Sequence, residues 1–199
     1  MLLSGLNNIH VEVGCDEVGR GCLAGPVVAA AVILPRNFSH ILLNDSKQVS
    51  KKNREFLNTL IRKKALAYSL GAVSPLEIDK INILNASILA MHKALDQIKI
   101  SFDSILVDGN RFHKYKEIEH HCIIKGDSKY LNIAAASILA KTFRDGLMKD
   151  LDSQFPMYYW KKNKGYPTKA HRSAIRELGI NQHHRLSFKL LPEELKLKI

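Results

Sequence analysis

The sequence predicts a single α/β domain, in which a β-sheet is flanked by helices and a helical portion follows at the C-terminal end. Short apolar segments of strand length alternate with longer segments that repeat apolar residues at helical spacing. Residues from about 155 to 199 change in texture, combining aromatic and basic residues with helix signals. A chain of 199 residues with 46% hydrophobic residues can bury one full core, so we predict one domain over residues 1–199.

The first part of the chain is predicted to contribute three strands and a helix. Val11–Cys15 has the pattern of an opening strand, and the apolar run Val27–Leu34, bounded by prolines, that of a buried strand. From Lys51 to Lys64, basic and apolar residues alternate at helical spacing, and Ser50 is a suitable N-cap. Leu66–Val73 is predicted to form a further strand.

The second part is predicted to contain three helices and two strands. Ile81–Ile98 carries one apolar stripe at helical spacing. Ser104–Val107 and His121–Ile124 are short apolar strands. Leu131–Met148 is a long, alanine-rich segment that predicts a buried helix, and a last helix is expected between Thr168 and Gly179, since glycine commonly ends helices.

Charge and composition narrow the classes of partner. Thirty Lys and Arg against nineteen Asp and Glu give a formal net charge of +11, which favours nucleic acid or an anionic membrane surface, or is simply a solvated basic surface. The longest apolar run is too short to span a bilayer, and the absence of Lys or Arg before Arg20 argues against a secretory signal. Cys15, Cys22 and Cys122 lack the spacing of a disulfide framework or zinc site. We expect a cytoplasmic protein without membrane contact.

Three acids stand at the C-terminal ends of predicted strands, the edge of an α/β sheet where reacting groups collect: Asp16, Glu17 and Asp108. Because neighbours on a strand point to opposite faces, Asp16 and Glu17 can share a site only if the strand ends there. Converging carboxylates require a cation, and Mg²⁺ prefers oxygen ligands. Simpler interpretations are a turn at Asp108-Gly109, an N-cap at Asp127 and solvated acids at Asp16 and Glu17. These patterns alone leave the alternatives open.

Five sequence blocks together point to one known family. They are GCDEVGRGCLAGPV at 14–27, NDSKQVS at 44–50, LVDGN at 106–110, the segment Lys125–Asp145 and the segment Asn163–Phe188. In this order they resemble the signatures of type 2 ribonuclease H, ribonuclease HII, over nearly the whole chain, and five ordered blocks are far more specific than one motif. The resemblance implies a ribonuclease H-like mixed β-sheet flanked by helices.

The resemblance also implies an activity and the residues that perform it. Asp16, Glu17, Asp108 and Asp127 would be the four active-site acids around two Mg²⁺ or Mn²⁺ ions, with Asp16 touching both ions and Asp127 beside the attacking water. The enzyme would hydrolyse the RNA strand of RNA–DNA hybrids and cut on the 5′ side of ribonucleotides embedded in duplex DNA, leaving a 5′-phosphate and a 3′-hydroxyl. Such a reaction belongs to ribonucleotide excision repair and DNA replication.

Substrate choice is expected from Gly19, Arg20, Gly21 and Tyr166. Glycines let backbone amides approach a sugar-phosphate closely, and the 2′-hydroxyl distinguishes RNA from DNA. The ring of Tyr166 can pack against the next sugar, favouring deoxyribose. Taken without the surrounding blocks, the glycines would indicate a tight turn and the tyrosine an ordinary core or surface aromatic.

Further candidates for substrate binding are basic or histidine residues, and the C-terminal portion is expected to help bind substrate. They are Lys47, Lys164, His171 and Arg185. Lys141 to Arg185 holds ten Lys or Arg and four acids, interleaved with aromatics, as on a phosphate-tracking surface. Arg144 is expected to pair with Asp145 or Asp150 on its own helix, and His183 and His184 to be hydrogen-bonded structural histidines.

Several rivals remain beside this interpretation. A basic nucleic-acid-binding module with the same fold would keep the charge and Tyr166 without needing four acids. A ribonuclease HIII-type enzyme would carry a sizeable N-terminal domain, for which Asp16 lies too near Met1. Another metal-dependent nuclease or phosphatase would not need the Gly19–Gly21 and Tyr166 blocks. The partners expected are RNA–DNA hybrid and ribonucleotide-containing duplex, bound by a monomer.

Overall fold

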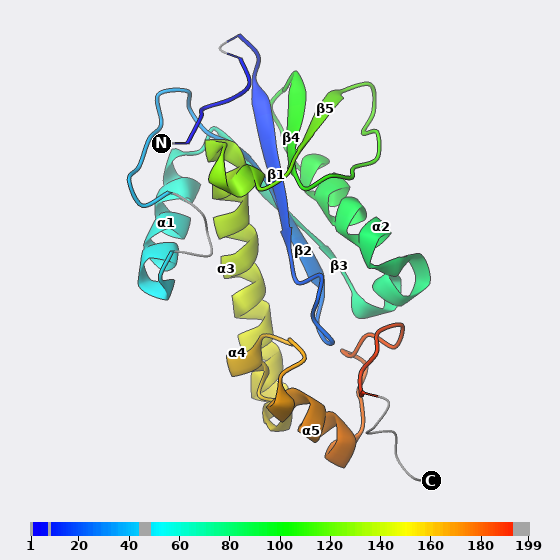
Figure 1. The fold of residues 1–199 in the computed structure, drawn as a ribbon. Helices are drawn as coiled ribbons and strands as arrows, with labels where there is room; N and C mark the ends of the chain where they lie inside the picture. The colour runs from blue at the N-terminus through cyan, green and yellow to red at the C-terminus, as the bar shows by residue number, and fades with distance from the viewer. Residues whose placement is uncertain (1, 8, 44–48, 193–199) are drawn as a thin grey trace.

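A computed structural model of the protein describes residues 2–7, 9–43 and 49–192 and shows a mixed sheet between helices (Figure 1). The strand order is β3-β2-β1-β4-β5. The strands are β1 (Glu12–Val18), β2 (Val27–Ile33), β3 (Ala67–Val73), β4 (Ser104–Asp108) and β5 (Glu119–Ile123). β2 runs antiparallel to β1 and β3, whereas β4 runs parallel to β1 and β5 parallel to β4. The predicted mixed sheet is confirmed.

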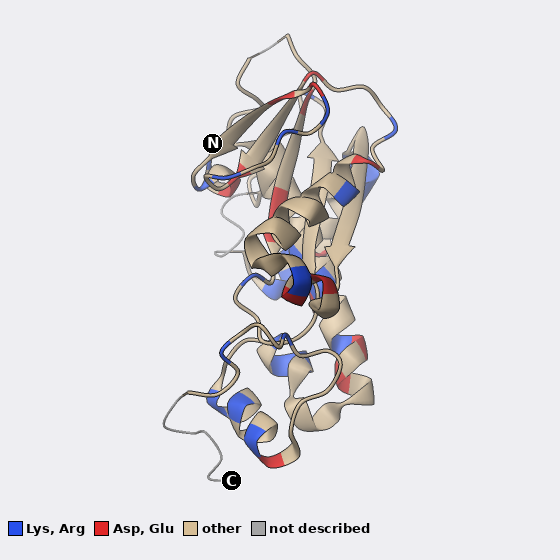
Figure 2. Cartoon of the chain, turned by 90° about the vertical axis from the view of Figure 1, so that its right-hand side faces the viewer, with Lys and Arg blue, Asp and Glu red and all other residues tan. Residues whose placement is uncertain are grey.

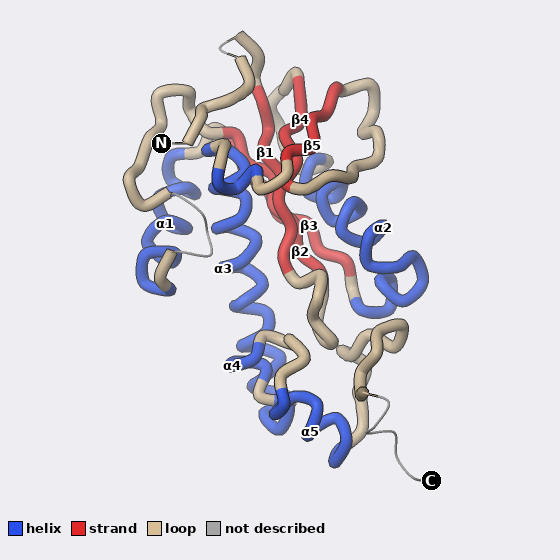
Figure 3. The backbone as a smooth tube through the Cα atoms, viewed as in Figure 1, coloured by secondary structure: helices blue, strands red, loops and turns tan. Residues whose placement is uncertain are grey.

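Helices cover both faces of the sheet. The α-helices are α1 (Lys51–Lys64), α2 (Pro75–Leu95), α3 (Leu131–Gln154), α4 (Trp160–Asn163) and α5 (Lys169–Leu178), with short 3₁₀ turns η1 (Gly126–Ser128) and η2 (Pro156–Tyr158). α2 lies on one face, and α3 lies on the other with α1 beside it (Figure 3). The predicted α1 is confirmed together with its cap, in which the Ser50 side chain accepts a hydrogen bond from the Asn53 amide.

Strand β2 contributes to both cores because alternate residues point to opposite faces. Ala29 and Ala31 lie in the apolar cluster under α2, whereas Val28, Ala30 and Val32 lie in the cluster under α3 and α1. All of these side chains are buried. The small alanines let helices approach the sheet closely on each side.

The contact between β1 and α3 is tighter still. A Cβ atom on Gly14 would lie 2.3 Å from the backbone carbonyl carbon of Asn132. The Asn132 side chain donates to the Glu12 carbonyl at 2.7 Å and accepts from the Leu34 amide at 3.0 Å. These contacts hold the first turn of α3 against the strand that carries Asp16 and Glu17.

Several element boundaries differ from the sequence prediction, among them the end of α3, which lies at Gln154 and not at Met148. Helix α2 begins at Pro75, not at Ile81, because Ser74 and Glu77 form a capping box, a signal that is independent of the apolar stripe. Asn82, with φ of 66°, interrupts this helix one residue after the predicted start. Strand β1 continues beyond Cys15 to Val18, which affects the site described below.

The C-terminal portion is helical, as predicted, and packs on the end of α3 (Figure 1). Its own apolar cluster joins Leu23 and Met148 to Trp160 and Ile175. Lys and Arg are spread over these helices and the loops between them (Figure 2). In the part of the chain that the structure describes, no helix has both the length and the apolar character needed to cross a membrane.

We expect Gly14→Ala to lower the free energy of unfolding by about 2–3 kcal/mol, because the added methyl group collides with the backbone of α3, which cannot give way as a flexible side chain would. Denaturant unfolding monitored by circular dichroism measures this loss. The matched control is Gly146→Ala, since a Cβ there meets nothing within 4 Å. It should stabilise the helix by about 0.5–1 kcal/mol. Equal effects of the two substitutions would contradict the tight contact.

Candidate active site

Asp16 and Glu17 lie inside β1, so the expectation that the strand ends at them is wrong. Cys15 belongs to the α2-side cluster, and Val18 packs against the α3-side cluster. By the alternation of side chains, Asp16 points to the α3 face and Glu17 to the α2 face. Asp16 is only 6% exposed. The two acids therefore point to opposite faces of the sheet.

Asp108 stands beside Asp16 through the parallel pairing of β1 with β4. The register pairs Cys15 with Val107, and Asp16 and Asp108 are the next residues along the two strands. Oδ1 of Asp108 accepts a hydrogen bond from the Gly126 amide at 2.6 Å. This bond ties the end of β4 to η1, the turn that contains Asp127.

Asp127 lies buried in η1, before helix α3. The N-cap residue of α3 is Tyr130, so the alternative interpretation of Asp127 as a helix N-cap is wrong. Its charge raises the pKa of Asp16, as do the charges of Glu17 and Asp108. The structure thus brings all four predicted acids into one electrostatic group.

Burying the acids together raises the pKa values of Asp16 and Glu17. Burial is the largest cause that raises the pKa of Asp16 well above its usual value, followed by the negative charges of Glu17 and Asp108, while a hydrogen bond from Ser137 opposes the rise. Burial likewise raises the pKa of Glu17 although Arg20 forms an ion pair with it at 3.2 Å. Cations placed among these carboxylates would favour their charged forms.

The donor chemistry of the group fits hard divalent ions, which prefer carboxylate oxygens. Among the described residues, however, no three His, Cys, Asp or Glu side chains are placed so that they could hold one ion as they stand. Ion binding would therefore require carboxylate side chains to rotate toward Asp16. The residues are of the type that binds such ions and lie near one another, but they are not arranged as a preformed coordination site.

The segment Gly19–Gly21 follows β1 directly and forms a tight turn. Gly19 has φ of 96°, and a Cβ there would lie 2.2 Å from Nε of Arg144. Gly21 has open space around its Cα, with nothing within 4 Å of an added Cβ. The turn is thus held on one side and leaves its other glycine open for a close approach by a ligand backbone.

Two buried arginines hold the segment between β1 and β2 through its carbonyl groups. Arg144 donates to the carbonyls of Pro26, Ala24 and Lys164 at 2.9, 3.0 and 2.8 Å. Arg185 donates to Gly25 from Nε and Nη2 and to Arg20 from Nη1. The structural role of Arg144 is confirmed, but its expected partners are wrong, because it faces loop carbonyls and not Asp145 or Asp150. Arg185 is equally buried, so any effect on substrate would pass through the turn.

Tyr166 is exposed at 44% and is positioned from two sides. Its hydroxyl forms a hydrogen bond with Cys22, and its carbonyl accepts one from Nδ1 of His171 at 3.0 Å. His171 is fully buried and also accepts a hydrogen bond from Nε1 of Trp160 at 2.9 Å. The structure therefore places His171 behind Tyr166, as a residue that holds the loop.

The remaining basic candidates differ in their placement. Lys164 is half-buried, with its carbonyl bound by Arg144, and it lines a groove beside α3. Lys47 lies outside the described residues. His184 is a hydrogen-bonded structural histidine, as predicted, whereas Nε2 of the neighbouring His183 is buried without a partner in the described structure.

Comparison with known proteins decides the family. The sequence model of ribonuclease HII matches residues 13–191. The chain belongs to the ribonuclease HII family. It is 59% identical to the ribonuclease HII of Christiangramia forsetii, over 98% of this chain and 99% of that protein. The ribonuclease HII of Bacteroides thetaiotaomicron is 60% identical over 96% of each chain.

Solved structures agree with this assignment. The ribonuclease H2 of Pyrococcus horikoshii gives a TM-score of 0.73 at 25% identity, covering 90% of this chain and 94% of that one. Bst-RNase HIII in complex with Mn²⁺ gives the same TM-score at 20% identity, with 90% of this chain and 67% of that one covered, and shows the shared fold. The predicted ribonuclease H-like fold is confirmed, and the chain is a ribonuclease H-type endonuclease.

Two residues that position the site are not predicted from the sequence. Cys22 has no role assigned to it by its sequence block, yet it bonds the Tyr166 hydroxyl. Ser137 lies in the alanine-rich run of α3, and its hydrogen bond lowers the pKa of Asp16. Both are small polar residues in apolar segments, which is the one pattern that could have marked them as partners of buried polar groups.

We expect stability to fall as the pH is lowered, because burial lowers the pKa of His184 to about 4, with the neighbouring His171 adding to the effect. The unfolded chain, with an ordinary histidine pKa near 6.5, then binds more protons than the folded one. This contribution is present above about pH 6.5 and is lost toward pH 4, by at most about 3 kcal/mol.

Urea unfolding between pH 7 and pH 4 measures this dependence. His184→Gln should flatten it, whereas replacement of the exposed His10 by Gln should leave the wild-type slope. A His184→Gln protein with the wild-type slope would show that other groups cause the pH dependence.

Proposed function

We propose that this ribonuclease HII hydrolyses the RNA strand of RNA–DNA hybrids and cuts 5′ of ribonucleotides embedded in duplex DNA, using two Mg²⁺ or Mn²⁺ ions and leaving a 5′-phosphate and a 3′-hydroxyl. The observation that carries the proposal is the electrostatic group of Asp16, Glu17, Asp108 and Asp127, gathered where β4 ends beside β1. The Mn²⁺ bound by the fold-related Bst-RNase HIII supports the choice of ion.

Each acid has a role that its position supports. Bound ions would supply activation of a water molecule and stabilisation of the leaving oxygen. Asp16 lies between the other acids and is suited to contact both ions, while Glu17 and Asp108 complete the ligand set. Asp127, on the turn behind Asp108, is suited to orient the attacking water. Arg20 pairs with Glu17 and favours its charged form.

The turn after β1 and the ring of Tyr166 support the choice of substrate. The open space at Gly21 lets a ribose approach the backbone, where amides can recognise its 2′-hydroxyl. Tyr166 is exposed, and Cys22 and His171 limit its movement. We propose that the ring packs on the following sugar, and that residues from about 155 onward help to bind the duplex.

Asp16→Asn should abolish cleavage while leaving the fold intact, because it removes the charge that faces the other acids. The assay uses an end-labelled DNA duplex with one ribonucleotide, with Mg²⁺ or Mn²⁺ and with EDTA. The matched control is Asp150→Asn on the exposed side of α3, which should cut like wild type. Wild-type protein that binds the duplex but never cuts it would favour the alternative, a basic binding module without activity.

Tyr166→Ala should weaken the preference for a ribonucleotide followed by deoxyribose by about tenfold, the scale of a lost stacking contact. Tyr166→Phe is the matched control, because it keeps the ring and removes only the hydroxyl that bonds Cys22. Ratios of kcat/KM for a single-ribonucleotide duplex and a uniform hybrid measure the preference. If both variants lost it equally, the hydroxyl and not the ring would be responsible.

A further inference from the structure

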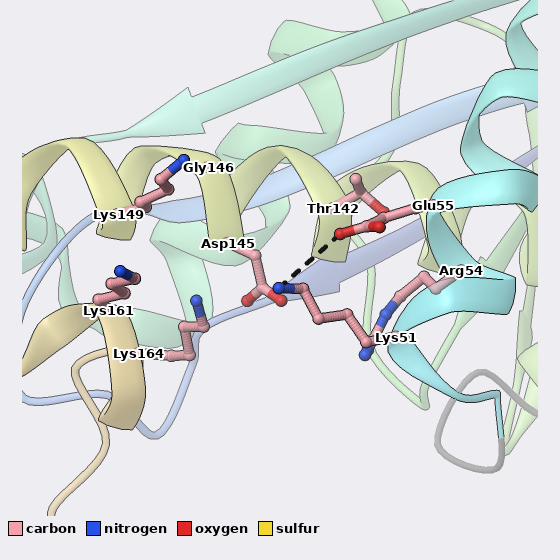
Figure 4. Close-up of a pocket in the computed structure, with 9 residues that line it drawn as sticks. All are labelled: Lys51, Arg54, Glu55, Thr142, Asp145, Gly146, Lys149, Lys161 and Lys164. Atoms are coloured by element: carbon pink, nitrogen blue, oxygen red, sulfur yellow. Dashed lines mark ion pairs between the residues drawn. The ribbon is translucent and has the colours of Figure 1, made fainter.

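A basic groove of about 500 Å³ lies beside α3, on the side that faces α1 and α4 (Figure 4). Its cationic lining is Lys51, Arg54, Lys149, Lys161 and Lys164. The acids that line it are Glu55 and Asp145. Lys51 reaches in from α1 and Lys164 from the opposite wall, both toward Asp145 (Figure 4). Five cations from three walls therefore surround one hollow that contains two acids.

The cations on α1 stand where they oppose helix stability. Lys51 is the first residue of α1, Arg54 follows in the same turn, and this turn contains no acid. The N-terminal end of a helix carries partial positive charge, which favours anions and disfavours cations. The exposed pair between Lys51 and Glu55, at 3.8 Å, offsets little of this cost. A bound anion would relieve the repulsion.

The groove connects to the candidate active site through α3. Ser137 on this helix contacts Asp16, and Gly146 lines the groove, about 14 Å farther along the helix axis. Asp145 lines the groove and also raises the pKa of Tyr166, although burial raises that pKa more. The spacing of phosphates along one strand is about 3.4 Å, so for a duplex lying along α3 this distance corresponds to about four base pairs.

We propose that this groove binds the phosphodiester backbone of the duplex about four base pairs from the cut, as an anchor outside the catalytic centre. The inference rests on the proposed function for the position of the cut. Lysine side chains at the mouth of a hollow can follow a phosphate backbone without reading its sequence. The anchor would therefore add affinity for any sufficiently long duplex and no base preference.

The test compares wild type with Lys149→Gln/Lys161→Gln, two exposed groove residues. Affinity for a single-ribonucleotide duplex is measured in EDTA, so that binding is read without cleavage. We expect the dissociation constant to rise about tenfold near 0.1 M salt, and the slope of log affinity against log salt to become shallower by about 2, as for two lost phosphate contacts. The matched control, Lys63→Gln/Lys64→Gln, removes the same charge at the other end of α1 and should change neither.

Duplex length gives a second, independent measurement. Duplexes are shortened stepwise from one side of the ribonucleotide and then from the other. For one of the two sides, the difference between wild type and the groove variant should vanish once fewer than about four base pairs remain. A groove variant that binds long duplexes like the Lys63/Lys64 control would overturn the anchor, whether or not the wild type cuts. Failure of wild-type cleavage alone would instead overturn the proposed function.

Discussion

The burial of two guanidinium groups among backbone carbonyls is the constraint on which the site depends. Arg144 and Arg185 are almost fully inaccessible, and the carbonyls that they bind belong to the turn after β1 and the loop after α4. Burial lowers the pKa of Arg185 to about 10, which measures how strongly its charge is deprived of water. A buried guanidinium group without a carboxylate partner is tolerated only when several carbonyl dipoles converge on it. The loops therefore cannot move apart without leaving a buried cation unpaired. The acids on β1 and the exposed Tyr166 are thereby kept in one frame.

The acids on β1 and β4 destabilise the same region, because buried negative charges repel one another. Like charges gather where β4 ends beside the C-terminal half of β1, because the parallel register brings Asp108 next to Asp16, and burial makes their repulsion costly. The scaffold resists this cost by tight packing elsewhere, through the contact of Gly14 with the backbone at Asn132 and through the alanines on both faces of β2. Backbone packing thus fixes where the acids stand on their strands, while the orientation of their side chains depends on partners such as Gly126 for Asp108 and Arg20 for Glu17.

Local features of the fold could be predicted from the sequence, whereas those that depend on distant partners could not. Helix α1 and its Ser50 cap follow from neighbouring residues and were correct to the residue. The start of α2 has a local signal, the capping box of Ser74 and Glu77, but the apolar stripe alone predicts a start near Ile81 and therefore misses the first turns. The length of β1 depends on pairing with β2 up to Val18, which no local pattern contains. The partners of Arg144 lie more than a hundred residues away or in another loop, so a pairing along its own helix was the only interaction visible in the sequence.

The basic surface and the acidic centre occupy different places in the protein, and this separation explains how a basic protein can use an acidic centre. The net charge of +11 attracts a polyanion from a distance, but the acids at the end of β1 would repel the phosphate nearest to them. The lysines beside α3 cannot neutralise that repulsion, because at physiological salt a charge more than about 8 Å away is largely screened. Capture of the duplex and admission of the reacting phosphate are therefore separate electrostatic steps: lysines can hold the flanking backbone, whereas only cations among the carboxylates can make the centre attractive to a phosphate. This division explains why buried acids and a strongly basic surface occur in the same small domain.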